Sequence, residues 1–176
     1  TNQEIPQGLL DFVASFLPDI HSSNNNILLL RNRILEFRDS LDEYGKLSAS
    51  QVRGINRTLI NFRLDRKKIT DSSTEEQLRE IFDDLLKRVD IIPVRLVMAQ
   101  AIIESGWGSS KYAKEGNNYF GIRCYTPGCG MEPEGIDSAD FFVKTYPDVK
   151  SSITNYLWIL NTGNAFRGVR TARQEF

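Results

Sequence analysis

The spacing of apolar and polar positions predicts a largely helical first half of the chain. Residues 5–17 place apolar side chains at helical intervals, and Pro18 is expected to end that helix. A second helix is predicted over residues 24–41, because it follows a Ser-Ser-Asn-Asn-Asn cluster suited to N-capping. Two more helices are predicted to start at the cap residues Ser48 and Thr74 and to run to about residues 62 and 89.

The segment from Leu96 to Ile103 contains no charged residue and follows Pro93, which can open a helix at its first turn. This pattern predicts a helix buried over most of its circumference and ended by the glycines on either side of Trp107. Glu104 would then lie at the negative end of the helix dipole, against apolar surface, and both effects disfavour the charged carboxylate. A carboxyl group that keeps its proton suits general acid catalysis. The alternative is a helix-terminal glutamate that simply reaches solvent.

After residue 108 the pattern changes to aromatic and β-branched stretches separated by turn residues. Residues 109–113 predict one short helix, while residues 119–124 and 140–146 predict the strands of a small hairpin lobe. A further helix is predicted over residues 149–160, and a last, basic helix is expected to begin at Asn164. The predicted fold class is therefore mostly α, of the α+β type.

Composition narrows the possible functions. The chain has 176 residues, enough for one domain with a real core or for a domain with an extension. It carries 22 Lys and Arg against 23 Asp and Glu, and the net charge of −1 gives no overall attraction for nucleic acid or an anionic membrane. No apolar run approaches the roughly 20 residues of a membrane span. Because no signal peptide precedes Thr1 and no initiator Met is present, we expect a processed or trimmed chain.

Cys124 and Cys129 are the two cysteines of the chain and enclose the turn-forming pair Pro127-Gly128. Such a turn could bring the sulfurs together in a disulfide, which would indicate an oxidising compartment. Two free thiols are the main alternative. A zinc site is the least favoured interpretation, because there is no second cysteine pair and the single histidine, His21, is distant in sequence. No metal, nucleotide or redox cofactor is predicted.

Aromatic side chains gather after Glu104 and would line a cleft between the helical part and the hairpin lobe. Sugar rings stack on aromatic faces, so a cleft of this kind suits a glycan. Core packing is the alternative role for each ring. The candidate substrate-binding aromatics are Trp107, Tyr112, Tyr119, Tyr125, Tyr146 and Tyr156.

Two runs of residues have a familiar pattern: Ala99-Gln-Ala-Ile-Ile-Glu-Ser-Gly-Trp-Gly-Ser-Ser110 and Asn117-Asn-Tyr-Phe-Gly-Ile122. They resemble the A-Q-A-x-x-E-S-G-W-G-x-S and N-N-L-F-G signatures of glycoside hydrolase family 73, the bacterial endo-beta-N-acetylglucosaminidases. Within that family the chain is similar to the Bax-like group, whose ending, N-T-H-x-A-Y followed by F-R-x-x-R, corresponds to residues 161–166 and 169–173. The similarity is clear over residues 93–173 and looser before them.

The resemblance implies a lysozyme-like fold: an N-terminal helical extension, residues 1–90, packed on a catalytic domain, residues 91–176, that is truncated at its C-terminus. It also implies cleavage of the β-1,4 bond that follows N-acetylglucosamine in the glycan strands of peptidoglycan. Glu104 matches the general acid of the family. A periplasmic or otherwise extracytoplasmic place in the bacterial cell envelope is expected, and no oligomer is implied.

Glycoside hydrolysis normally uses a second carboxylate. The position that carries it in many relatives falls near Phe142, and an aromatic side chain cannot act as a base. Asp140 is the preferred candidate, because it would share a strand face with Phe142. The other carboxylates of this lobe are Glu132, Glu134 and Asp137. A mechanism without a second carboxylate is also open, in which the acetamido group of the substrate assists or Tyr156 positions water.

Three further positions bear on the site. Gly163 and Phe166 replace a His and a Tyr of the Bax-like ending, so any polar role of those side chains is lost. Asn118 precedes the Tyr-Phe-Gly turn and would bind the acetamido group of a sugar or, as we slightly prefer, cap the turn.

Other functions compete with the glucosaminidase. A muramidase or lytic transglycosylase would share the fold and the helix-borne glutamate, and a peptidoglycan-binding scaffold would have lost efficient chemistry. Proteins of this likeness are also labelled amidases, but the sequence offers no nucleophilic Ser, no Cys-His pair and no metal centre for amide cleavage. The basic stretch of Arg167, Arg170 and Arg173 would meet carboxylates of an anionic glycan or, as preferred, form a solvated helix face.

Overall fold

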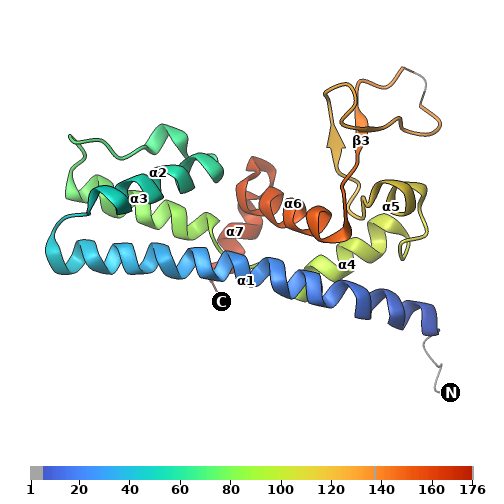
Figure 1. The fold of residues 1–176 in the computed structure, drawn as a ribbon, viewed down its shortest axis with the longest axis horizontal. Helices are drawn as coiled ribbons and strands as arrows, with labels where there is room; N and C mark the ends of the chain where they lie inside the picture. The colour runs from blue at the N-terminus through green and yellow to red at the C-terminus, as the bar shows by residue number, and fades with distance from the viewer. Residues whose placement is uncertain (1–5, 137, 176) are drawn as a thin grey trace. The chain divides into compact units, whose positions relative to one another are not determined.

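The computed structural model describes residues 6–136 and 138–175 and confirms the predicted class, since helices dominate over one small antiparallel sheet (Figure 1). The α-helices in this part of the chain are α1 Gln7–Tyr44, α2 Ala49–Asn61, α3 Glu75–Arg88, α4 Val94–Ser105, α5 Lys111–Gly116, α6 Val149–Thr162 and α7 Arg167–Arg173. Two short 3₁₀ helices accompany them, η1 Asp65–Lys67 and η2 Asn164–Phe166. Among the described residues, none of the helices combines the length and the apolar character needed to cross a membrane.

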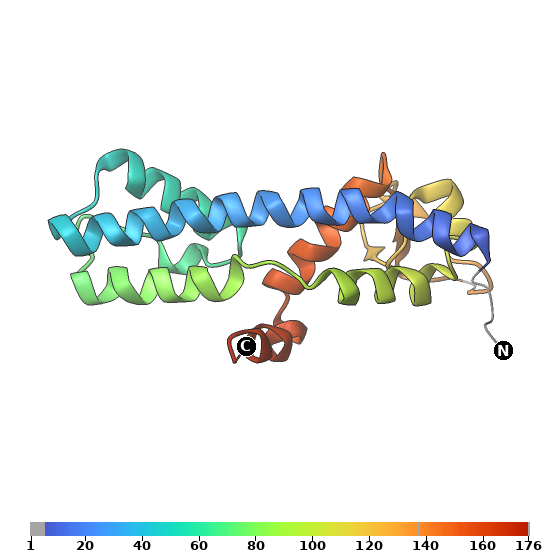
Figure 2. The ribbon, with the colours of Figure 1, turned by 90° about the horizontal axis from the view of Figure 1, so that it is seen from below.

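Helix α1 is one continuous helix where two were predicted (Figure 2). The predicted break at Pro18 is therefore wrong, because the proline lies inside the helix and the Ser-Ser-Asn-Asn-Asn cluster is helical too. A stripe of buried and partly buried side chains passes through the predicted break at intervals of alternately four and three residues: Phe16, Ile20, Ser23, Ile27, Leu30, Ile34, Phe37 and Leu41. Packing along this stripe outweighs the hydrogen bond that a proline removes from a helix.

The starts of α2 and α3 confirm the predicted caps. Ser48 and Thr74 each accept a hydrogen bond from the backbone N–H three residues later. The side chains of Gln51 and Gln77 in turn accept one from the backbone N–H of the cap residue. These reciprocal bonds satisfy N–H groups that a helix start otherwise leaves without partners.

The chain packs as two compact units that interleave in sequence. The first unit joins the described part of Thr1–Ser23 to Ile92–Leu157, and the second joins Asn24–Ile91 to Trp158–Phe176. Leu59, Phe82 and Leu85 are fully buried in the core of the second unit. The boundaries of these units fall after Ser23, Ile91 and Leu157. The division into an N-terminal extension and a catalytic domain stays a prediction.

Helix α4 is buried on one face only, so the prediction that most of its circumference is buried is wrong. Val97, Met98 and Ala101 are buried, whereas Ile103 is 69% exposed. Single exposed apolar residues are common on protein surfaces, and a segment without charges is therefore not necessarily buried.

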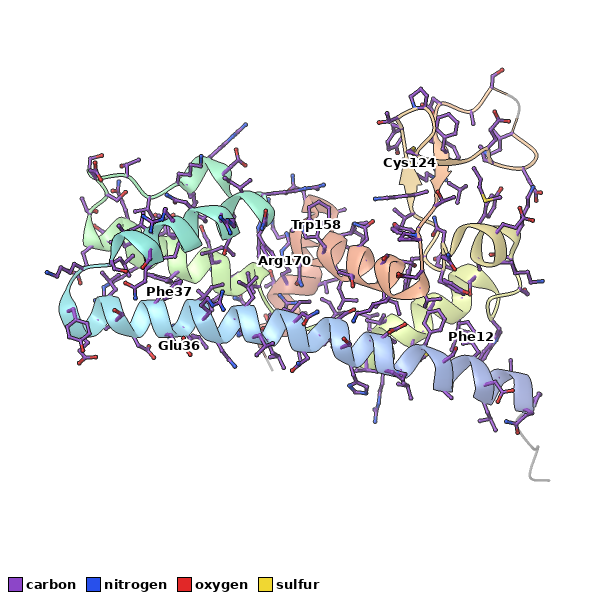
Figure 3. The ribbon with its side chains drawn as sticks, viewed as in Figure 1. Phe12, Glu36, Phe37, Cys124, Trp158 and Arg170 are labelled. Atoms are coloured by element: carbon purple, nitrogen blue, oxygen red, sulfur yellow. A yellow bond between two sulfur atoms is a disulfide. The ribbon has the colours of Figure 1, made fainter. Side chains whose placement is uncertain are left out.

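The small sheet has the strand order β1-β3-β2, with β1 Arg123–Cys124, β2 Gly130–Met131 and β3 Phe142–Lys144. Its strands are shorter than the two predicted ones, and β2 was not predicted. Arg123 pairs with Val143 and Cys124 with Phe142 in the β1–β3 ladder. A disulfide joins Cys124 to Cys129 and closes the connection between β1 and β2, as the Pro-Gly turn predicted (Figure 3).

Candidate functional site

Glu104 lies in the last turn of α4, in the first unit, and its side chain is exposed rather than held against apolar surface. Its carboxylate nevertheless has a close neighbour. A Cβ placed on Gly121 would lie 3.3 Å from Oε2 of Glu104, and Gly121 has a φ of +62°. The carboxylate thus lies against the backbone of the turn that leads into β1, where a glycine leaves room for it.

The turn after Glu104 is fixed by its own backbone. Gly106, Trp107 and Gly108 have positive φ angles of 56°, 57° and 75°, a left-handed conformation that is unusual for a tryptophan. The N–H of Trp107 donates to the carbonyl of Ile102 at 3.0 Å. The buried hydroxyl of Ser105 donates to the carbonyl of Ala101 at 2.6 Å and accepts from the N–H of Gly108 at 2.8 Å. Glu104 is therefore held at the start of a rigid turn.

An aromatic cluster packs against this turn, and it includes two side chains of α1, of which Figure 3 labels Phe12. Phe12 stacks on Phe16 with ring centroids 4.5 Å apart and meets Trp107 edge to face at 5.9 Å. Tyr119 meets Phe16 edge to face at 4.7 Å. Trp107 is 40% exposed, so it is accessible for stacking on a sugar.

Phe12 and Phe16 escaped the sequence analysis, which treated the first ninety residues as scaffold. The signal that could have found them is the apolar stripe of α1, which continues toward the N-terminus through Phe12. The stripe predicts that these rings are at least partly buried, but it does not show that they pack against Trp107 and Tyr119.

Tyr156 of α6 is buried and packs against the residue before Gly121. Its ring stacks on Phe120 with centroids 4.2 Å apart and an angle of 3° between the planes. Burial raises the pKa of Tyr156, and the negative charge of Glu104 raises it further. The phenol therefore stays protonated at neutral pH and lies within electrostatic reach of Glu104.

Two other predicted tyrosines have structural partners. Tyr146 is buried and donates its hydroxyl proton to Oδ1 of Asn155 at 2.7 Å, so it is a core residue and its predicted place in a cleft is wrong. The hydroxyl of Tyr112 accepts the backbone N–H of Glu134 at 2.7 Å. Tyr125 is 71% exposed in the disulfide loop.

Asn118 caps a turn, which confirms the preferred of the two predicted roles. Its amide nitrogen donates to the carbonyls of Ile122 at 2.8 Å and Lys144 at 2.7 Å. Its amide oxygen accepts the N–H groups of Phe120 at 3.3 Å and Ile122 at 3.1 Å. The side chain is 2% exposed and has no donor left for the acetamido group of a sugar.

The candidate second carboxylates lie toward the other end of the sheet. Beyond the β1–β3 ladder, the N–H of Lys144 donates to the carbonyl of Ile122 at 2.9 Å, in the same antiparallel register. Extending this register by one residue pairs Gly121 with Thr145. Asp140 lies before β3 rather than on it, five residues from Thr145, which is up to about 16 Å of extended chain. The expectation that Asp140 shares a strand face with Phe142 is therefore wrong.

Glu134 forms an ion pair with Lys111 at 2.9 Å, and Glu132 is exposed just beyond β2. Asp137 lies outside the described residues. Within residues 6–136 and 138–175, no group of three or more His, Cys, Asp or Glu side chains could hold a metal ion.

Comparison with known proteins gives the context of this site. The chain is similar to Protein bax of Escherichia coli (strain K12), with 31% identity over 164 residues that cover 93% of this chain and 54% of that protein. The chain thus spans about half the length of the curated relative it matches. No solved structure matches, and the lysozyme-like character of the fold stays a prediction. Residues 79–175, more than half of the chain and with Glu104 among them, match the family described as mannosyl-glycoprotein endo-beta-N-acetylglucosaminidase, and the chain belongs to this glucosaminidase family of glycosidases.

Proposed function

We propose that the protein hydrolyses the β-1,4 bond that follows N-acetylglucosamine in peptidoglycan, with Glu104 as the general acid. One observation carries this proposal. The only carboxylate of the matched signature lies exposed at the end of α4, against Gly121 and within electrostatic reach of Tyr156, with the partly exposed ring of Trp107 three residues further on. A glycan strand can reach Glu104 and Trp107 from solvent.

Glu104 would protonate the glycosidic oxygen as the bond to the anomeric carbon breaks. Retaining enzymes with two carboxylates hold them about 5 Å apart and inverting enzymes hold them about 6.5–9.5 Å apart. Asp140 lies before β3, beyond the end of the β1–β3 ladder that is remote from Gly121. This favours assistance by the acetamido group of the substrate, with the protonated phenol of Tyr156 positioning that group or the attacking water.

A second carboxylate from Asp140, Glu132 or Glu134 is the alternative, and two variants separate the mechanisms. Under acetamido assistance, Tyr156→Phe lowers kcat by about tenfold or more, while Asp140→Asn leaves kcat within about twofold of the parent protein. A large loss of kcat in Asp140→Asn with an unchanged Tyr156→Phe enzyme would restore the two-carboxylate mechanism.

The disulfide between Cys124 and Cys129 supports a place outside the cytoplasm, since structural disulfides persist in oxidising compartments. The proposed substrate is a long anionic glycan, and the proposal includes no cofactor and no oligomer.

The direct test is turnover of purified peptidoglycan sacculi by the Glu104→Gln variant, which keeps the shape of the side chain and removes its acid. We expect a loss of about 10²- to 10⁴-fold in kcat with the fold intact by circular dichroism. Glu115→Gln, at an exposed position of α5, is the matched control and keeps full activity. Unchanged turnover by Glu104→Gln would contradict the assignment of Glu104 as the acid, whereas no turnover by the parent protein would favour a binding or scaffolding protein.

The products identify the bond that is cut. N-acetylglucosamine at the new reducing ends of the muropeptides supports the proposed specificity. N-acetylmuramic acid at those ends would indicate a muramidase, and its anhydro form a lytic transglycosylase.

A further inference from the structure

The second unit contains a surface cavity of about 350 Å³ whose lining is strongly cationic. Lys87 and Arg88 come from the end of α3, and Arg167 and Arg170 come from α7. Asp84 is the acidic residue of the lining, so four positive side chains face one negative one. The cavity is separate from the residues around Glu104, all of which belong to the first unit.

Two of these arginines are anchored by the backbone (Figure 3 labels Arg170). Nη1 of Arg88 donates to the carbonyls of Phe62 at 2.7 Å and Thr162 at 3.2 Å. Nη1 of Arg170 donates to the carbonyls of Leu160 at 2.9 Å and Gly163 at 2.8 Å. These bonds occupy one nitrogen of each guanidinium group and fix its orientation, which leaves the other edge of the planar fork for a further acceptor.

The positive charge of the cavity is not compensated within the described part of the chain. Asp84 already forms ion pairs with Lys67 and, at 3.7 Å, with Lys87. By contrast, Arg31 and Arg173 of the same unit lie 3.5 Å and 3.6 Å from the carboxylate of Asp90. No carboxylate of the described residues forms such a pair with the three arginines of the cavity.

The arginines also repel one another. Burial lowers the pKa of Arg170, and the charges of Arg88 and Arg167 lower it further. Burial is likewise the main cause that lowers the pKa of Arg88, with Arg63 and Arg167 adding repulsion against the attraction of Asp84. Like charges gathered in a partly buried cavity are unfavourable unless an anion joins them.

We infer that this cavity is a binding site for a multiply charged oxyanion, either a phosphate or a group of carboxylates. Guanidinium forks match both groups with paired hydrogen bonds. Arg88 and Arg170 would bind through the free edges of their anchored forks, and the exposed Arg167 would close over the anion from α7. The anion could come from free solute or from the substrate polymer, and the inference does not depend on catalysis at Glu104.

The test measures the Tm of the whole chain in sodium phosphate and in sodium citrate, each against sodium chloride at the same ionic strength. We expect a saturable rise in Tm with either oxyanion, because a ligand that binds the folded state stabilises it. Arg167→Gln should weaken the apparent Kd by about tenfold, since it removes one charged partner. Arg53→Gln, an exposed arginine of α2, is the charge-matched control and should respond like the parent protein.

A second variant tests the charge argument without any ligand. Arg167→Glu supplies a carboxylate to the cavity, so it should raise the Tm above that of Arg167→Gln in chloride and abolish the response to phosphate. Competition between peptide-bearing peptidoglycan fragments and phosphate would identify the polymer as the source of the anion, and its absence would identify a free solute. Equal Tm values in phosphate, citrate and chloride, or an equal response from Arg167→Gln and Arg53→Gln, would overturn the inference.

Discussion

Asn118, beside the Gly121 turn, is expected to stabilise the fold of the site rather than to bind the substrate. The side chain of Asn118 is buried and makes four hydrogen bonds, each to a backbone group. Asn118→Ala leaves these groups without partners, and we expect it to lower the free energy of unfolding by about 2–4 kcal/mol in urea titrations. KM of the remaining folded enzyme should stay close to that of the parent. A raised KM without a loss of stability would instead assign Asn118 to sugar binding.

Gly121 tests whether the carboxylate of Glu104 depends on its close backbone neighbour. In Gly121→Ala the new methyl group lies 3.3 Å from Oε2 of Glu104, on a residue with a φ of +62°. We expect a fall in kcat of about tenfold, because the acid must move, together with a stability cost of about 1 kcal/mol from the left-handed backbone.

The control for that variant is Gly45→Ala, at a glycine with a φ of +66° and no atom within 4 Å of the added Cβ. It should show the same stability cost and no loss of kcat. Equal kcat values in the two variants would show that the contact with Gly121 has no part in positioning the acid.

Elements of the fold differ in how far local sequence determines them. The caps at Ser48 and Thr74 were predicted because a capping box needs only four consecutive residues. Glu104 was proposed as a site residue because a charge after an uncharged helix is likewise a local feature, and its role stays a prediction. The continuity of α1 through Pro18 was not predicted. The proline and the polar cluster suggest a break in the sequence, but the buried stripe packs without a break along the folded helix.

The sheet, like the continuity of α1, depends on contacts that local sequence does not reveal. Strands of two or three residues carry too short a pattern to predict their ends, and the register that separates Asp140 from Gly121 is set by pairing between distant segments. The contact of Phe12 with Trp107 joins residues nearly a hundred positions apart, and no local rule predicts it.

The N-terminal turns of α1 should therefore affect the chemistry although they lie outside the matched residues 79–175. A Cβ on Gly108 would lie 3.1 Å from the ring of Phe12, so this ring packs directly against the turn after Glu104. Phe12→Ala removes that support, and we expect kcat/KM on peptidoglycan to fall by about tenfold, mainly through kcat.

Phe12→Leu, which keeps most of the packing volume, should restore much of that activity, and Leu10→Ala at an exposed position of α1 is the control. If Phe12→Ala lowers only the Tm and leaves kcat/KM of the folded enzyme unchanged, Phe12 has no positioning role.

At the scale of the whole molecule, the two units differ in their sensitivity to alkaline pH. Burial raises the pKa of Tyr119, Tyr146 and Tyr156, and all three belong to the first unit. The tyrosine of the second unit, Tyr44, is 63% exposed. A tyrosine whose pKa is raised by folding keeps its proton longer in the folded state than in the unfolded one. Its full contribution to stability is therefore present below the unfolded pKa of about 10 and is lost as the pH rises from that value through the higher pKa of the folded state.

Each unit also contains one tryptophan, Trp107 in the first and Trp158 in the second, so emission from single-tryptophan variants can follow the units separately. We expect the emission maximum of Trp107, in Trp158→Phe, to shift at a lower alkaline pH than that of Trp158, in Trp107→Phe. Tyr44 and Lys67 are the competing groups of the second unit, because Glu43 raises the pKa of Tyr44, and Asp84 and then Glu80 raise the pKa of Lys67. Both side chains lie at the surface, which makes their contributions to stability small. Coincident shifts of the two tryptophans would contradict the assignment of alkaline sensitivity to the buried tyrosines of the first unit.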